Sequence, residues 1–189
     1  MAITIDNLFA SGFSGKVGGN MVFRRRKSGK IVIARAPKKS KIAPSEKQRA
    51  MRGRFATATK YARLVRDNPS LYAQYAAAVE GDQTPSNLAI RDSYTPPQVV
   101  SINVSGYSGE EGDMIGLRAT DDFKVDRVRV SIFTAAGDLQ EEGEAVQAGD
   151  TDDWIYTATV ANKQPKGCSV KAVATDLPGN EGVRELQIG

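Results

Sequence analysis

The chain has 189 residues, of which 40% are hydrophobic and 25% are charged, enough for one large packed domain or two small ones. It contains no histidine and a single cysteine, Cys168. These counts exclude an intrachain disulfide, a catalytic site built on histidine and a zinc site of four Cys or His ligands. We therefore expect no enzyme, and only a carboxylate- or metal-dependent catalytic site stays open.

The N-terminus lacks the basic start and long apolar stretch of a secretory signal, and no apolar run approaches the roughly 20 residues that span a bilayer. The sequence thus predicts a protein that is cytoplasmic at synthesis and has no membrane partner. Later incorporation into a virion or another large particle stays open.

Charge is distributed very unevenly along the chain. Residues 1–66 contain 17 lysines and arginines against two acids, a net charge of +15. Residues 67–189 contain nine lysines and arginines against 20 acids, a net charge of −11. Such an asymmetry points to a polyanionic partner or to a charged surface that contacts other proteins.

The first 15 residues offer little pattern beyond a few apolar side chains before a Gly/Ser turn. Four of these apolar residues are candidates for a strand or plug that is donated to a neighbouring copy, which would assemble a homo-oligomer: Ile3, Ile5, Leu8 and Phe9.

Two β-branched apolar runs follow, on either side of a Ser28-Gly29 turn signal, and they predict a β-hairpin. Its tip is strongly basic, and a flexible, basic connection follows it directly. This arm supplies most of the candidate residues for binding DNA, RNA or another polyanion: Arg24, Arg25, Arg26, Lys27, Lys30, Arg35, Lys38, Lys39 and Lys41.

A helix is predicted from Ser45 to about Arg66, because Ser45 and Gln48 have the spacing of a capping box. Apolar residues recur on one face at helical spacing: Met51, Phe55, Ala58, Ala62 and Val65. The opposite arc adds four cations to the candidate polyanion-binding set: Arg49, Arg52, Lys60 and Arg63.

A second helix should begin at Asn68-Pro69, with Leu71, Tyr75 and Val79 as its apolar stripe and Gly81 as its stop. Thr84-Pro85 can open a third, short helix.

Pro96 and Pro97 then mark a domain boundary, because paired prolines continue neither a helix nor a central strand. Beyond them the apolar period changes to two, with Val128, Val130, Trp154, Tyr156 and Val170 as predicted core residues. Seven candidate strands follow: 99–104, 114–120, 125–133, 139–147, 154–160, 169–175 and 183–188. Seven short strands in about 90 residues predict an antiparallel β-sandwich over 98–189, preceded by a basic region over 1–95.

The strand segments LRATDDFKVDRVRVSIFTAAGDL, WIYTATV and VKAVATDLPGNEG resemble bacterial immunoglobulin-like modules. The resemblance includes a turn formed by Ala174, Asp176, Gly179 and Asn180, and it covers about half of the chain. It implies an immunoglobulin-like fold and no particular function. The first half resembles uncharacterised small basic proteins of bacteria and their phages, which favours a role in a virion or prophage.

Taken together, the expected fold is α+β. It comprises an N-terminal basic β-hairpin with a short helical pair and a C-terminal all-β immunoglobulin-like sandwich of about seven strands.

Two features could suggest bound ligands. Ser14-Gly15-Lys16 lacks the other residues of a phosphate-binding loop, so we expect no nucleotide, no cofactor and no small-molecule substrate. Acidic loops at Asp121-Asp122, Asp150 to Asp153 and Asp176 carry ligands suited to calcium. Because no calcium-loop motif is present, solvated acidic turns are the favoured interpretation, and no metal site is predicted.

The leading hypothesis is therefore a non-catalytic structural or assembly protein, with a basic arm that contacts nucleic acid or an acidic partner. The alternative is a cytoplasmic, nucleoid-type nucleic-acid-binding protein in which the sandwich serves as a spacer or an oligomerisation unit.

Overall fold

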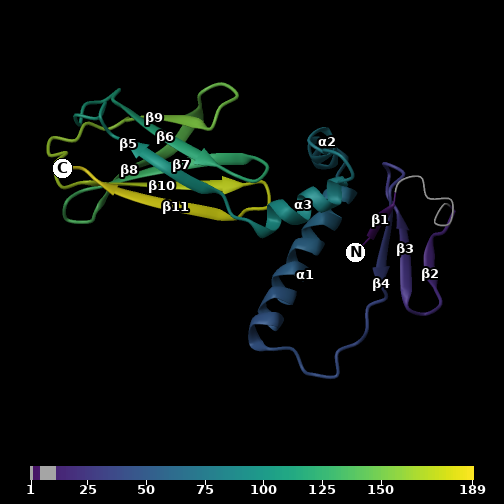
Figure 1. Cartoon of the computed structure of the whole chain (residues 1–189). Helices are drawn as coiled ribbons and strands as arrows, with labels where there is room; N and C mark the ends of the chain where they lie inside the picture. Colours follow the sequence, from purple (N-terminus) through teal and green to yellow (C-terminus); the bar gives the residue numbers. More distant parts are fainter. Residues whose placement is uncertain (1, 5–11) are drawn as a thin grey trace.

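The computed structural model describes residues 2–4 and 12–189. Its elements follow one another along an elongated molecule, with a basic sheet at one end, three helices in the middle and a β-sandwich at the other end (Figure 1). The chain is thus α+β, as the sequence predicts.

The predicted hairpin exists as β3 (Met21–Arg25) and β4 (Ile31–Arg35), and two short strands extend it to four. β2 (Gly15–Val17) pairs with β3, and β1 (Ala2–Thr4) pairs with β4. Neither short strand is predicted from the sequence, because each has only three residues. The turn between β2 and β3 uses Gly18 and Gly19, whose φ angles of 58° and 72° lie in the left-handed region that favours glycine.

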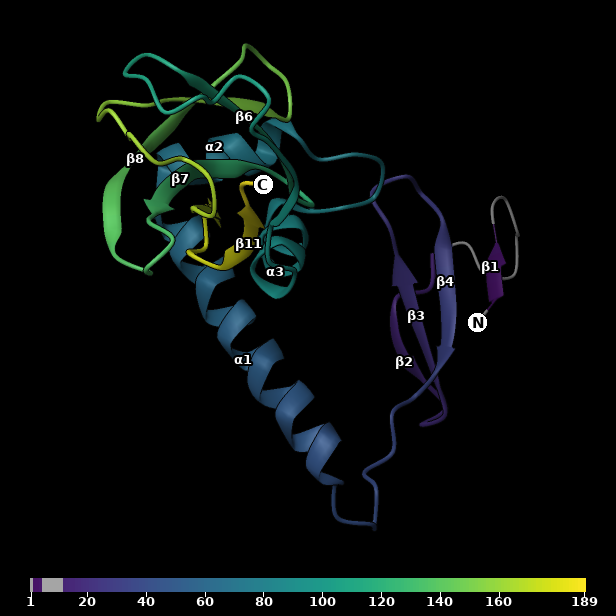
Figure 2. The same cartoon turned by 90° about the vertical axis from the view of Figure 1, so that its left-hand side faces the viewer.

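An extended segment, 36–45, leads from this sheet to the first helix (Figure 2). α1 (Glu46–Asp67) begins with the predicted capping box between Ser45 and Gln48. α2 (Pro69–Ala77) is capped by the Asn68 side chain and α3 (Pro85–Tyr94) by that of Thr84, as expected from their Asn-Pro and Thr-Pro starts.

The helices differ from the sequence pattern in two respects. The apolar stripe of α1 is buried only in part: Met51 and Phe55 are 52% and 56% exposed, while Ala58, Ala62 and Val65 are buried. The N-terminal half of α1 extends away from the core that the three helices share, so its apolar side is covered only in part (Figures 1 and 2). α2 ends at Ala77, so Val79 lies beyond the helix. Among the described residues, no helix is long and apolar enough to cross a membrane.

All seven predicted strands of the C-terminal half are present, with small shifts at their ends. They are β5 (Gln98–Asn103), β6 (Met114–Thr120), β7 (Val125–Phe133), β8 (Leu139–Gln147), β9 (Asp153–Thr157), β10 (Ser169–Asp176) and β11 (Glu181–Gln187). Every pairing is antiparallel, in the order β11-β10-β7-β8-β9-β6-β5. β8 pairs with β7 through most of its length and with β9 through Val146 and Gln147, so it joins the two layers of the sandwich.

The sandwich is almost closed on its other side, where β11 lies against β5. Gly182 makes this approach possible, because a Cβ at that position would lie 1.9 Å from the carbonyl oxygen of Pro97. The Arg184 guanidinium also donates a hydrogen bond to the carbonyl of Val100. The enclosed core contains the predicted residues Val128, Val130, Trp154, Tyr156 and Val170, each buried to at least 95%.

A second, smaller core joins the helices to one end of the sandwich. Ala62, Val65, Tyr75, Leu88 and Ala89 form its centre. Phe123 from the β6–β7 loop and Leu177 from the turn after β10 pack against it. Side chains therefore make contact across the predicted boundary at Pro96-Pro97. Independent folding of residues 98–189 stays a prediction.

Candidate nucleic-acid interface

The basic sheet presents arginines on both of its faces. Arg25 pairs with Ile31 and Arg24 with Val32, and neighbouring residues of a strand point to opposite faces. Arg35 lies four residues after Ile31 on β4, so its side chain points to the same face as that of Arg25. The tip of the hairpin adds three more of the candidate cations, Arg26, Lys27 and Lys30.

The other candidate cations lie on the segment that follows and on α1. Lys38, Lys39 and Lys41 belong to the extended stretch between β4 and the helix. Arg49, Arg52, Lys60 and Arg63 form one arc of α1, about 20 Å long at 1.5 Å per residue. The arc continues along the projecting half of the helix, where the apolar side is also exposed.

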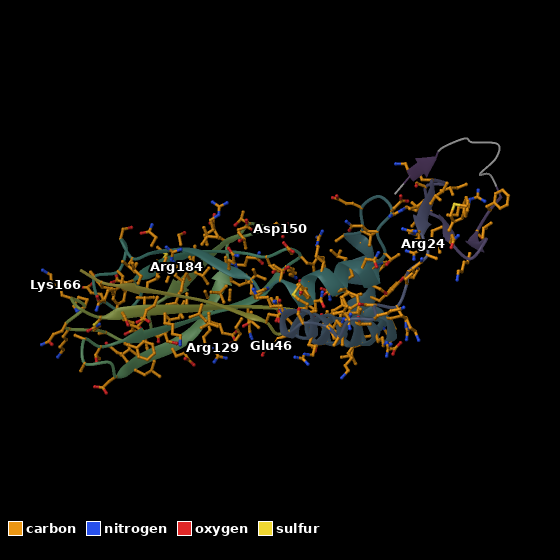
Figure 3. The ribbon with its side chains drawn as sticks, turned by 60° about the horizontal axis from the view of Figure 1, so that its bottom comes forward. Arg24, Glu46, Arg129, Asp150, Lys166 and Arg184 are labelled. Atoms are coloured by element: carbon orange, nitrogen blue, oxygen red, sulfur yellow. The ribbon has the colours of Figure 1, made fainter. Side chains whose placement is uncertain are left out.

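All thirteen candidate cations are exposed, and within residues 2–4 and 12–189 none of them forms an ion pair. They lie within residues 24–63, on the basic sheet, the segment that follows it and α1, and so outside the acidic sandwich. Figure 3 shows Arg24 in the sheet at one end of the molecule and Lys166 at the far end of the sandwich. The structure therefore leaves this positive charge available to a partner.

One contact holds the hairpin tip against the helices. The backbone N–H and the hydroxyl of Ser28 donate hydrogen bonds of 3.0 and 2.9 Å to the Asp82 carboxylate in the loop between α2 and α3. These bonds, followed by the charges of Arg26 and Lys30, hold the pKa of Asp82 below its usual range. Asp82 could not be predicted from the sequence, because nothing local links it to a turn 54 residues away.

The exposed apolar residues of α1 have partial cover from the end of α3. The Tyr94 hydroxyl donates a hydrogen bond of 3.0 Å to the Met51 sulfur, and the Arg54 guanidinium lies 4.6 Å from the centre of the Tyr94 ring. Phe55 remains 56% exposed beside these contacts. This part of α1 therefore combines apolar and cationic surface.

Of the four predicted assembly residues, Ile3 alone lies in the part of the chain that the structure describes. The backbone of Ile3 lies in β1, opposite Val32. Ile5, Leu8 and Phe9 lie outside the described residues. Donation of this segment to a neighbour stays a prediction.

The acidic loops do not form a single cluster. Asp121 and Asp176 come together at the helical end of the sandwich, where Asp92 of α3 joins them. Asp92 is not among the residues predicted from the sequence, although its helical position gives a signal. Asp92 lies four residues after Leu88 and therefore shares the buried face of a short amphipathic helix.

Comparisons with known proteins identify no family for this chain. No family model matches it, and no curated protein matches it. Among solved structures, it is similar to a tetra-tandem repeat in the extending region of a large adhesion protein, with 18% identity over 49% of this chain and 23% of that chain, at a TM-score of 0.35. It is also similar to an engineered protein, with 14% identity over 57% of this chain and 23% of that chain, at a TM-score of 0.33. The chain thus spans about a quarter of the length of either.

Proposed function

We propose that this protein is a non-catalytic structural component of a large assembly, such as a virion, and that its basic N-terminal region binds nucleic acid. The observation that carries the proposal is the set of thirteen exposed cations between Arg24 and Arg63, without ion pairs among the described residues. Lysines and arginines that contact phosphates release bound counterions, which drives binding without regard to base sequence.

The distribution of these cations suits a phosphate backbone better than base edges. They lie on a sheet, an extended segment and a helix, rather than on one recognition helix. Phe23, the aromatic residue within the hairpin strands, is half-buried and packs on Phe13, with ring centres 5.6 Å apart. Sequence-independent binding follows from this arrangement.

We infer that the sandwich is an immunoglobulin-like module that makes protein contacts. Its strands divide into β5, β6 and β9 on one side and β11, β10, β7 and β8 on the other, an arrangement found among such modules. Its exposed faces carry most of the chain's acids, so a second copy could bring its basic region against them. Exposed ion pairs contribute only about 0–1 kcal/mol each, so apolar contacts such as those of Phe55 would have to hold such an assembly.

The second candidate function is a nucleoid-type protein that binds nucleic acid as a monomer. The Ser28–Asp82 contact favours it, because it fixes the hairpin tip on the chain's own helices instead of leaving it free for a neighbour. Both candidates use the same cations and differ in whether copies associate.

Binding can be tested by charge reversal at two neighbouring arginines. For the double variant Arg25→Glu/Arg26→Glu we expect weaker binding to every DNA or RNA duplex, whatever its sequence. The slope of log affinity against log salt concentration should flatten by about two units, because each lost phosphate contact removes about one. Fluorescence anisotropy of a labelled duplex across a salt series gives both quantities.

The matched control is Lys163→Glu/Lys166→Glu, which changes the net charge equally at exposed positions on the far end of the sandwich. It should keep the wild-type slope. Equal slopes for the wild type and for Arg25→Glu/Arg26→Glu would show that the hairpin is not part of the binding surface. If the two double variants weaken binding equally, overall charge and no particular surface governs it.

A further inference from the structure

A buried acidic cluster lies where the helices meet the sandwich. Asp92 comes from the last turns of α3, Asp121 from the loop between β6 and β7, and Asp176 from the end of β10. One carboxylate oxygen of each lies within 4.8 Å of the others. Asp92 is 0% exposed and Asp176 2%, while Asp121 is half-buried.

Most oxygens of the cluster are held by hydrogen bonds from their own surroundings. The Tyr75 hydroxyl donates to Asp92 Oδ2, and the backbone N–H groups of Phe123 and Lys124 donate to Asp121 Oδ2, each at 3.1 Å. The backbone and side-chain amides of Asn180 donate to Asp176 at 2.6 and 2.7 Å. The three carboxylates are therefore fixed in place by donors on the rim of the cluster.

Two oxygens have no such donor. Asp92 Oδ1 and Asp121 Oδ1 are both buried without a hydrogen-bond partner, and the two carboxyl groups lie within hydrogen-bonding reach of each other. Within the described part of the chain, neither they nor Asp176 pairs with a lysine or arginine. An unpartnered carboxylate oxygen on a fully buried side chain is costly, so something positive has to compensate it.

A proton is one compensating group. Burial, reinforced by Asp121 and Asp176, raises the pKa of Asp92 to about 8. A proton neutralises only one carboxylate, however, and burial also raises the pKa of Asp176. A divalent cation would compensate all three carboxylates at once, and a ring of carboxylate oxygens is the ligand set that hard cations prefer.

We propose that Asp92, Asp121 and Asp176 form a binding site for a divalent cation of the calcium class, which joins α3 to the end of the sandwich. The ligands are oxygens only, in a chain without histidine, and this selects against zinc and copper. Calcium accepts the irregular geometry of ligands from three separate segments more readily than magnesium does.

Binding at this site stabilises the junction between helices and sandwich, because the three ligands meet only in the folded chain. In the full-length protein freed of metal with EDTA at neutral pH, added CaCl₂ should raise the midpoint of thermal unfolding. At about a hundredfold excess over the dissociation constant, the rise should be roughly 5–10 °C. Isothermal titration should give about one ion per chain.

The variant Asp92→Asn removes one ligand charge at nearly constant size and should abolish the calcium-dependent rise. Asp121→Asn, at a half-buried position, should do the same and serves if Asp92→Asn fails to fold. The matched control is Asp138→Asn, an exposed aspartate in the turn between β7 and β8 at the other end of the sandwich. It should respond like the wild type.

Two results would overturn the proposal. The first is a wild-type midpoint that neither Ca²⁺ nor Mg²⁺ raises at millimolar concentration, which would leave a proton as the occupant. The second is an equal rise in the wild type, Asp92→Asn and Asp121→Asn, which would locate the ion elsewhere. A rise with Mg²⁺ that exceeds the rise with Ca²⁺ would contradict the choice of calcium.

Discussion

Replacing Trp154 by alanine should lower the free energy of unfolding of the sandwich by about 3–5 kcal/mol. The indole is 5% exposed and lies on β9, within a core to which both layers contribute side chains. Its removal leaves a cavity that strands paired on both sides cannot close by moving together.

Equilibrium denaturation in urea, followed by circular dichroism because the variant lacks the tryptophan, measures this loss. The control is Val146→Ala on the adjacent strand β8, where the side chain is 72% exposed. This variant should change the free energy of unfolding by no more than about 0.5 kcal/mol. An unchanged midpoint for Trp154→Ala would show that the ring is not part of the core.

Replacing Tyr75 by alanine should unfold the helical region at a lower temperature than the sandwich. Tyr75 is fully buried in the smaller core, where its ring stacks on Phe123 with centres 4.4 Å apart. Its hydroxyl also lies 2.9 Å from that of Tyr61. The expected loss is again about 3–5 kcal/mol, here confined to the helices and their contact with the sandwich.

Two optical signals separate the two regions. Circular dichroism follows the three helices, while the fluorescence of Trp154, the chain's one tryptophan, follows the sandwich. In Tyr75→Ala the helical transition should move down in temperature and the fluorescence transition should stay. Tyr72→Ala, on the same helix at a 38% exposed position, should leave both in place. If both signals move together in Tyr75→Ala, residues 98–189 do not form an independent domain.

The sandwich could be predicted from the sequence because each strand carries its own signal. A period of two, as in Trp154 and Tyr156, specifies which residues face a core before the partner strands are known. The signals that mark the helix starts are equally local, since a cap such as Ser45 satisfies a backbone group only three residues away.

The sequence could not predict features that depend on contacts between distant parts of the chain. Helical spacing places Phe55 on the apolar face of α1 but cannot tell whether anything covers that face. The acidic cluster is a similar case, because Asp92, Asp121 and Asp176 are brought together only by the packing of α3 on the sandwich. The thirteen cations could be predicted from the uneven charge distribution and from the hairpin and helix patterns, and their exposure is what the structure adds.

The most direct test of the proposed structural role is the mass of the full-length protein after nuclease treatment. Light scattering coupled to size exclusion, at about 0.15 M salt and over a range of concentrations, should find species larger than the 20.3 kDa monomer. Deletion of residues 1–15, which contain the predicted assembly residues, should abolish these species. A protein that stays monomeric under these conditions, yet binds DNA through residues 16–66, would contradict the assembly role and leave the nucleoid-type function in its place.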